Sequence, residues 1–588
     1  MRLFFFLTTF LITNSTFGNT KALKTLGEIS NWKQTGRYLE VERLCKIFAR
    51  RYPEEVDCIS FGTTPEGRTM RALVVADSKR GLSAFWVKRK QRPVIYFQGG
   101  IHAGEIDGKD AGFWLLRQIL EKEAAPKLLK ALKNVTLVFV PVFNVDGHER
   151  FGKYNRPNQV GPEEMGWRTT AQNYNLNRDY LKADSIEMQQ LLKLLERWDP
   201  IVGLDLHVTD GAQFQHDVSL IMEPLFHGVT ELRELTKGIQ ENLLASLKLQ
   251  GHLPVGFYPS FRTDDDPSSG FSLGVAPPRY SQGYLSLKNR IGILVETHSW
   301  KNYATRVQAT RNVLENIIIL AGENGKQWKR VIARVDAKSI NQIGESVGLT
   351  FENTERKREI EFLGYRYKKE SSTVSGGIKT GYFPAEPEIW KVPLYDEVVP
   401  KIEAEIPEGY WVPKAFSSLV LHKLDVHGIS YRVITDGFGE KEVGVFRADT
   451  FSFANRSFEG HQGLTITGDW KKEKRVLSEG DIFITCRQPK SLLVVHLFEP
   501  KAPDSLLAWG FFNTRFEPKE YMENYVAEVL GEEMLLKPEI QKVFEGKLSD
   551  PEFRNSNEKR LEFFHRLHSS WDENLGLYPV YRAIEAFK

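Results

Sequence analysis

Four side chains that could bind or polarise a substrate lie at three widely separated places in the sequence, and each place follows a short apolar run. His102 and Glu105 belong to the segment His-Ala-Gly-Glu, and His207 and Glu296 follow further along the chain. Short apolar runs of this kind are typical of buried strands. Because ligands in an open α/β sheet bind at the carboxyl ends of the strands, we expect the four side chains to meet at one edge of a sheet.

Two imidazoles and one carboxylate are the usual protein ligands of a catalytic zinc ion, which keeps a fourth position open to water. We therefore expect His102, Glu105 and His207 to hold one Zn²⁺ per chain at about 2.0–2.3 Å. Glu296 then remains free to act as a base. A His-x-x-Glu pair alone is a weak signal. Here, however, a strand and two glycines precede the pair, and a helix is expected to follow it.

Two other histidines are rival metal ligands. His148 lies in the loop after the segment Asn-Val-Asp-Gly, and His298 lies two residues past Glu296. Histidines in such positions more often support a site or face solvent than bind a metal. We therefore do not expect His148 or His298 to be a ligand.

A polar stretch between residues 167 and 179 contains candidates for substrate binding. Arg178, beside Asn177, could grip a carboxylate through a bidentate hydrogen bond. Arg168 could polarise a carbonyl oxygen as it becomes an oxyanion. The alternative is a loop held together by ordinary ion pairs, and these residues alone do not decide between the two.

The elements that must position these residues alternate between strands and helices. Strands are expected over 94–98, 135–141, 201–206, 218–222 and 291–295, and helices over 108–123, 185–197, 229–247 and 303–320. This alternation is typical of a mixed, mostly parallel, doubly wound sheet with helices on both faces. The predicted fold class is therefore α/β, with residues 21–335 as the catalytic domain.

The pattern changes near residue 335. Strands are expected over 346–353, 358–367, 418–425, 429–435 and 443–448, two more within 476–498, and helices near 518–535 and 555–568. No catalytic set is visible in this half. We therefore predict that residues 336–588 form a β-rich accessory region with C-terminal helices, since such modules often lack chemistry of their own.

Bulk properties agree with an ordinary globular protein. The chain of 588 residues is too long for one core, so two or three domains are expected. Its composition, 41% apolar and 26% charged, is that of a globular protein. With a net charge of only +3, nothing in the sequence indicates the concentrated basic face that nucleic-acid binding requires.

The N-terminus predicts export. Residues 1–20 place one arginine before a short apolar stretch, which is typical of a secretory signal peptide, with a buried N-terminal helix as the alternative. No later segment is long and apolar enough to span a bilayer. We therefore expect a secreted or periplasmic protein. In such a compartment Cys45 and Cys58 could pair, although the sequence does not show whether their thiols meet.

The order of these motifs resembles that of the zinc metallocarboxypeptidases of the carboxypeptidase A type. The shared motifs are His-Ala-Gly-Glu at 102–105, Asn-Val-Asp-Gly at 144–147, Trp-Arg at 167–168, Leu-Asn-Arg at 176–178, the strand-end His207 and the strand-end Glu296. The resemblance covers about residues 25–325. The ordered set is far more specific than any one of its members.

The resemblance assigns a role to each residue. It implies that zinc is bound by His102, Glu105 and His207. It implies that Arg168 polarises the scissile carbonyl, that Asn177 and Arg178 hold the terminal carboxylate of the substrate, and that Glu296 is the general base.

Three positions depart from the family pattern. Ala103 replaces a common proline, which affects only the stiffness of the loop. Asn175 stands where many relatives place a carboxylate behind a zinc histidine, and an uncharged amide is expected to raise the basicity of the ligand less. The tyrosine that covers substrate in the family has no clear counterpart, and Tyr280 and Tyr284 are both candidates.

The resemblance implies a zinc exopeptidase that removes C-terminal residues from peptides with a free carboxylate. Two rivals remain open. One is a zinc amidase or deacylase acting on cell-wall peptides or N-acyl amino acids, and the other is a catalytically inactive binding protein on the same scaffold. The presence of Glu296 and Arg168 argues against the inactive protein. Side-chain preference and oligomeric state do not follow from the sequence.

Overall fold

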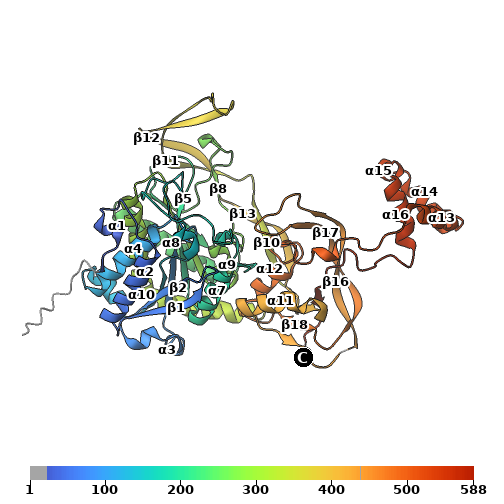
Figure 1. Cartoon of the computed structure of the whole chain (residues 1–588), viewed down its shortest axis with the longest axis horizontal. Helices are drawn as coiled ribbons and strands as arrows, with labels where there is room; N and C mark the ends of the chain where they lie inside the picture. Colours follow the sequence, from blue (N-terminus) through green and yellow to red (C-terminus); the bar gives the residue numbers. More distant parts are fainter. Residues whose placement is uncertain (1–22, 438, 588) are drawn as a thin grey trace, which may run out of the picture.

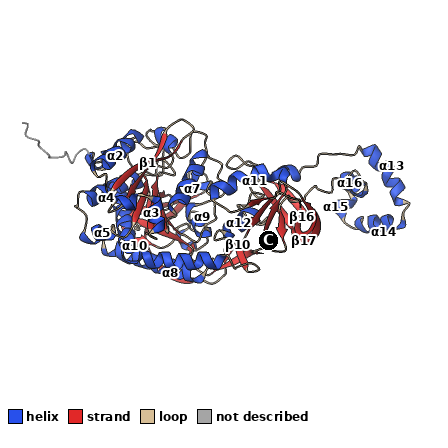
Figure 2. Cartoon of the chain, turned by 90° about the horizontal axis from the view of Figure 1, so that it is seen from below, coloured by secondary structure: helices blue, strands red, loops and turns tan. Residues whose placement is uncertain are grey.

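The computed structural model describes residues 23–437 and 439–587. The expected signal peptide, residues 1–20, lies outside the described residues. The N-terminal half forms an α/β body, and the second half forms a β-rich body beside it (Figures 1 and 2). A small group of helices extends from the β-rich body, away from the α/β body (Figure 1).

The elements of the α/β body follow the expected alternation. The helices are α1 (Leu26–Ile29), α2 (Tyr38–Arg51), α3 (Ala84–Arg89), α4 (Asp107–Leu120), α5 (Pro126–Ala131), α6 (Val145–Glu149), α7 (Ile186–Trp198), α8 (Thr230–Leu249), α9 (Ser281–Leu287) and α10 (Tyr303–Ser339). The strands are β1 (Val56–Thr63), β2 (Thr69–Val75), β3 (Val94–Gly99), β4 (Thr136–Val140), β5 (Val202–Thr209), β6 (Val218–Glu223), β7 (Pro254–Val255), β8 (Phe271–Ser272) and β9 (Ile291–His298).

The central sheet has the strand order β1-β2-β4-β3-β5-β9-β6-β7. Strands β4, β3, β5 and β9 are parallel neighbours, whereas β2 runs antiparallel to β4 and β6 antiparallel to β9. Helices α4 and α10 lie on one side of the sheet and α7 and α9 on the other (Figure 1). The mixed, doubly wound α/β fold expected from the sequence is therefore confirmed.

The inner strands are buried on both faces, as parallel strands covered by helices must be. Every residue of β3, β4, β5 and β9 is buried. Burial on both faces disfavours polar side chains, and in β3, β5 and β9 the polar residues lie from the middle of the strand toward its carboxyl end. This is why the chemistry-bearing residues stand directly after the apolar runs.

The second half contains more helix than its sequence pattern predicts. Its strands are β10 (Ser346–Asn353), β11 (Arg358–Ser371), β12 (Ile378–Tyr395), β13 (Val398–Glu405), β14 (Gly409–Val412), β15 (Arg432–Val433), β16 (Gly439–Phe453), β17 (Leu464–Leu477), β18 (Ile482–Thr485) and β19 (Tyr581–Ala583). Its helices are α11 (Lys414–His427), α12 (Ser491–Phe498), α13 (Asn524–Leu535), α14 (Pro538–Lys547), α15 (Pro551–Arg554) and α16 (Asn557–Leu567).

Two strand predictions in this half are wrong. Segment 418–425 lies within α11, where Val420, Leu424 and His427 bury one face at helical spacing. Gly428 ends that helix with a left-handed φ of 59°, a common helix stop. The end of segment 476–498 forms α12, which is buried along its whole length. A continuous apolar run does not distinguish a buried strand from a buried helix.

The two halves share one hydrophobic core. The expected boundary at residue 335 falls inside α10, which continues to Ser339. Buried residues of α11, α12 and β14 belong to the same apolar cluster as the central sheet. The long β11–β12 hairpin pairs with β8 of the N-terminal half. The second half is therefore packed against the N-terminal half and not tethered to it by a linker.

Two further sequence questions concern export. Cys45 and Cys58 form a disulfide with a Cα–Cα distance of 5.4 Å, which resolves the alternative left open by the sequence. Within the described part of the chain, no helix combines the length and the hydropathy that a bilayer crossing requires.

The first turn of α7 contains a buried carboxyl group that should make stability depend on pH. Glu187 is 1% exposed, and neither of its carboxylate oxygens has a hydrogen-bond partner among the described residues. Burial, with a smaller contribution from Asp146, raises the pKa of Glu187 from 4.5 to about 7. The folded state therefore favours the protonated form, and the free energy of unfolding should fall as pH rises from 4.5 through 7.

Glu187→Gln should remove this dependence and raise the free energy of unfolding by about 2–3 kcal/mol at pH 8, with little effect at pH 4. Chemical denaturation at several pH values measures this difference. Glu241→Gln, which changes an exposed glutamate of α8, is the matched control. An equal change in both variants would contradict the assigned role of burial.

Candidate metal centre and active-site cavity

A tight turn between β3 and α4 carries His102 and Glu105. The N–H of Glu105 donates to the carbonyl oxygen of His102 at 2.8 Å, which closes the turn. Gly104 between them permits a close backbone approach, because a Cβ at this position would lie 2.6 Å from the carbonyl oxygen of Gly166. The glycine therefore lets the loop pack tightly while both side chains converge.

Strands β5 and β9 supply His207 and Glu296. The two residues are direct partners in the parallel ladder between these strands. Both strands continue three residues beyond the expected ends, to Thr209 and His298. His207 and Glu296 therefore lie side by side near the carboxyl edge of the sheet.

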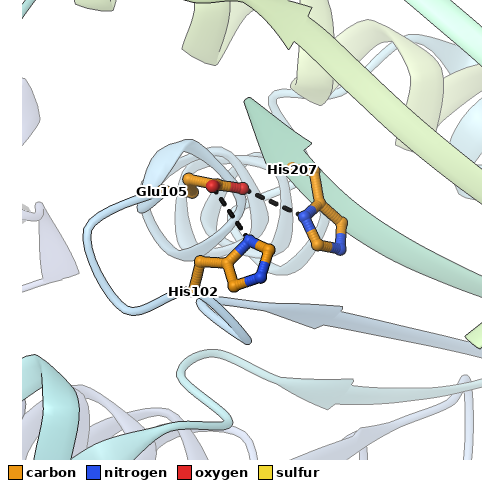
Figure 3. A group of neighbouring side chains, drawn as sticks. All are labelled: His102, Glu105 and His207. Carbon is orange, nitrogen blue, oxygen red and sulfur yellow. Dashed lines mark hydrogen bonds and ion pairs between the residues drawn. The ribbon is translucent and has the colours of Figure 1, made fainter. Parts of the chain in front are cut away.

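His102, Glu105 and His207 converge from these elements (Figure 3). His102 Nδ1 lies 2.9 Å from Glu105 Oε1, and His207 Nδ1 lies 3.0 Å from Glu105 Oε2. One ligand atom from each of the three residues lies within 4.8 Å of the others, and all three residues are buried. Two imidazole nitrogens and a carboxylate in this arrangement match the ligand set of a catalytic zinc site.

The outer contacts of the two imidazoles also fit a metal. His102 Nε2 lies 3.2 Å from Asn175 Oδ1, and His207 Nε2 lies 3.1 Å from Asp205 Oδ2. Because an oxygen atom lies within 3.2 Å of each Nε2 atom, we assign the ring protons to Nε2. The Nδ1 lone pairs then face the Glu105 carboxylate, a repulsive arrangement unless a cation or a proton lies between them. The residues present therefore fit a divalent metal.

The protonation of the three residues has different causes. Burial lowers the pKa of His102 to about 4, so its ring is neutral at physiological pH. Burial also disfavours a charged ring at His207, but Asp205 and Glu105 raise its pKa well above the usual range. Metal binding must then displace a proton from His207 and should weaken as pH falls.

Arg156 contacts the metal-site carboxylate and was missed by the sequence analysis. Its Nη2 lies 2.6 Å from Glu105 Oε1, and its side chain is 8% exposed. Burial alone would raise the pKa of Glu105, but His102 and Arg156 hold it well below the usual range. Arg156 lies in the polar loop after α6, where no periodicity indicates which side chain points inward.

A cavity of about 980 Å³ joins the metal site to most of the other candidates. The predicted residues that line it are His102, Glu105, Arg168, Asn177, Arg178, His207, Tyr280 and Glu296. The structure therefore brings together residues that the sequence separates widely.

Glu296 is a buried carboxyl group on the wall of this cavity. Its Oε2 has no hydrogen-bond partner among the described residues. Burial raises the pKa of Glu296 to about 8, and the negative charges of Glu105 and Asp205 add to this effect. Positive charge placed beside Glu296 would lower its pKa again. Such a group can exchange a proton near neutral pH, as a general base must.

Arg178 and Asn177 sit on a short 3₁₀ turn, Leu176–Arg178. The Arg178 guanidinium lies 4.7 Å from the centre of the Tyr280 ring, and its Nη1 donates to the carbonyl oxygen of Asn177 at 2.8 Å. No carboxylate within residues 23–437 and 439–587 forms an ion pair with Arg178. The ion-paired loop considered as an alternative therefore does not describe this arginine.

Arg168 faces the metal site. Its Nη1 lies 3.8 Å from Glu105 Oε1, and 37% of its side chain is exposed. Burial lowers the pKa of Arg168, although the group remains charged. Its position places the positive charge of the guanidinium beside the candidate metal ligands and open to the cavity.

The two tyrosine candidates have different positions. Tyr280 lines the cavity. Tyr284 is completely buried, and its hydroxyl lies 2.9 Å from His427 Nδ1 in the second half. Tyr284 therefore cannot cover a substrate, and its assignment to substrate binding is corrected. Tyr258, which the sequence analysis did not single out, also lines the cavity and is 42% exposed.

The rival histidines lie outside the metal group. His148 is buried, and its ring nitrogens lie 3.2 Å from the carbonyl oxygens of Ala103 and Gly36. His298 stacks on Phe214 with 4.0 Å between the ring centres. Both histidines support the surrounding structure.

The second half also reaches the cavity. Arg358 and Asp396, at the two ends of the β11–β12 hairpin, line its wall and form an ion pair at 2.6 Å. The hairpin is anchored by an aromatic cluster that includes Phe362, Trp390 and Phe271. The second half therefore helps to build the cavity.

Comparison with known proteins gives a match to one family model, over part of the chain. Residues 41–210 match the family model described as zinc carboxypeptidase. The inactive metallocarboxypeptidase ecm14 of Schizosaccharomyces pombe is 29% identical over 130 residues, which cover 22% of this chain and 23% of that protein. Carboxypeptidase 2 of Trichophyton tonsurans is 24% identical over 181 residues, which cover 30% and 29% of the two chains. These matches span between 23% and 29% of the relatives' own length.

Solved structures give weaker similarity. Carboxypeptidase A from Helicoverpa armigera is 14% identical, covers 51% of this chain and 74% of that chain, and has a TM-score of 0.35. The family match includes His102, Glu105 and His207, whereas Tyr280 and Glu296 lie beyond its end. The N-terminal half of this chain is thus similar to the zinc carboxypeptidase family over residues 41–210.

Proposed function

We propose that this protein is a zinc-dependent exopeptidase that hydrolyses the last peptide bond of peptides with a free C-terminal carboxylate. One observation carries the proposal. A His-Glu-His donor set, the buried carboxyl group of Glu296 and the unpaired cation of Arg178 line the same cavity of the described structure. The Cys45–Cys58 disulfide supports a secreted or periplasmic location, because disulfides persist in oxidising compartments.

Different residues of the chain would have different roles in hydrolysis. When bound by His102, Glu105 and His207, zinc would supply a Lewis acid that lowers the pKa of water. Glu296 would take the proton of the attacking water and deliver it to the leaving amine. Arg168 would stabilise the negative charge that develops on the carbonyl oxygen.

Substrate selection would come from the same wall of the cavity. Arg178 offers a planar fork of N–H donors that matches a carboxylate. The Tyr280 ring 4.7 Å away keeps the guanidinium in place without neutralising it. Asn177, on the same turn, supplies an amide next to the arginine. A peptide bound by its terminal carboxylate would then present its last peptide bond to the metal and Glu296.

Removing Arg178 tests this assignment. Arg178→Ala should lower kcat/KM for free-acid peptides by about 100-fold, because a buried charge pair loses one partner. Peptides with an amidated C-terminus should be poor substrates of the unmodified protein and should respond little to the substitution. Release of the C-terminal residue, followed by mass spectrometry, measures both.

Arg366→Ala is a suitable control, since Arg366 lies on the exposed part of the β11–β12 hairpin. Equal cleavage of acid and amide peptides by the unmodified protein would favour the amidase, deacylase or endopeptidase alternative. Zinc binding without hydrolysis of peptides, cell-wall fragments or N-acyl amino acids would favour the inactive binding protein.

A further inference from the structure

A turn from the second half reaches the loop that carries the substrate-binding residues. Phe458 and His461 exchange backbone hydrogen bonds of 2.8 and 3.1 Å, which closes a turn with Glu459 and Gly460 at its tip. Both tip residues have a left-handed φ, 49° at Glu459 and 81° at Gly460. Turns of this type favour Asn-Gly. The turn itself therefore does not explain a glutamate at position 459, where a left-handed φ costs about 1 kcal/mol.

The side chain of Glu459 has a specific partner. Its Oε2 accepts the backbone N–H of Asn175 at 3.0 Å, although the two residues are 284 positions apart. Asn175 Oδ1 accepts the N–H of Asn177 at 3.1 Å and lies 3.2 Å from His102 Nε2. Glu459, from the second half, thus holds Asn175 in place. Asn175 in turn orients His102 and begins the turn that carries Asn177 and Arg178.

The other end of this loop is held from the same side. His461 Nε2 lies 2.6 Å from Asp184 Oδ2, and Lys423 Nζ donates to Asp184 Oδ1 at 2.7 Å. His427 Nε2 lies 2.9 Å from the carbonyl oxygen of Leu181. Both ends of the segment 175–184 are therefore fixed by side chains of the second half.

We propose that Glu459 is a positioning residue of the active site, through which the second half fixes Asn175 and, with it, His102 and the Asn177–Arg178 pair. Without this acceptor the N–H of Asn175 loses its partner, and the segment that bears Oδ1 is free to shift. Such a shift would displace Asn175 Oδ1, which lies beside His102, together with the Asn177 and Arg178 donors for the substrate carboxylate. The kinetic part of the proposal rests on the proposed function, whereas the metal-binding part does not.

Two substitutions separate this role from a structural one. Glu459→Gln keeps an oxygen of the same reach and should remain within about two-fold of the unmodified protein in zinc affinity. Glu459→Asn suits the left-handed turn at least as well, but its side chain is one methylene shorter and does not reach Asn175. It should keep the thermal stability of the full chain while weakening zinc affinity about 10-fold, as loss of outer contacts to metal ligands does.

Zinc affinity is measured by competition with a chromophoric chelator, which needs no turnover. In the same variants, KM for a free-acid peptide should rise about 10-fold for Glu459→Asn and stay near normal for Glu459→Gln. Unchanged zinc affinity and unchanged KM in a stably folded Glu459→Asn variant would overturn the proposal, as would an equal loss in both variants. If the unmodified protein cleaves no peptide, the proposed function fails, and the zinc measurement alone still decides on Glu459.

Discussion

Glu296→Gln should lower kcat by at least about 1,000-fold while leaving zinc binding intact, because an amide cannot accept the proton of water. Glu296 lies beside His207 in the ladder of β5 and β9, but it is not a member of the metal-binding group. Gln has nearly the same shape and adds no charge to the buried site. The expected result is therefore a folded, metal-binding and inactive protein.

Single-turnover hydrolysis together with elemental analysis checks this expectation. Glu223→Gln is a useful comparison, since Glu223 is also buried but lies at the end of β6 and does not line the cavity. Near-normal turnover by Glu296→Gln would contradict the assigned base. Loss of zinc from this variant would mean that Glu296 is a ligand.

Truncation after Ser339 should abolish folding, although the sequence pattern alone suggests that the N-terminal part stands by itself. The cut would expose the side of the α/β body that packs against α11 and α12, including the fully buried Tyr284 and its partner site for His427. It would also remove β12, which pairs with β8 beside the cavity. The fragment should aggregate, or its circular dichroism spectrum should be that of an unfolded chain. It should not bind one zinc per chain.

Removal of the extended helices is the matched control. Helices α13 to α16 have a separate small cluster formed by Phe544, Phe553, Phe563 and Phe564. The chain leaves and re-enters the β-rich body at neighbouring points, since the N–H of Gly576 donates to the carbonyl oxygen of Arg515 at 2.9 Å. Replacing 517–574 with a short Gly/Ser linker should leave folding and zinc binding intact. A soluble, zinc-binding fragment 23–339 would restore the view of an independent catalytic domain.

The residues at the carboxyl edge of the sheet could be predicted because their places depend on local sequence. His102, His207 and Glu296 follow short apolar runs that alternate with expected helices, and the carboxyl ends of parallel neighbours meet at one edge. The burial of those strands follows from the same pattern, whereas the direct pairing of His207 with Glu296 is seen only in the structure. Local periodicity was sufficient for this part of the fold and of the site.

The supporting residues could not be predicted in this way. Arg156 and Tyr258 lie in aperiodic loops, and Glu459 acts across a contact between distant parts of the chain. No pattern within a short window shows which residue of such a loop points inward. The same limit explains the error at Tyr284, whose neighbour Tyr280 faces the cavity while Tyr284 faces α11 from the next turn of α9.

The most direct test of zinc-dependent exopeptidase activity uses one peptide in free-acid and amidated form. Release of its C-terminal residue is measured with metal-stripped protein, before and after zinc is returned. Without metal no residue should be released, and the hydrolytic activity should recover until one zinc is bound per chain. The residue should be released from the acid peptide only. Hydrolysis that is equal with and without zinc, or a protein that takes up no zinc, would contradict the proposed zinc-dependent exopeptidase activity.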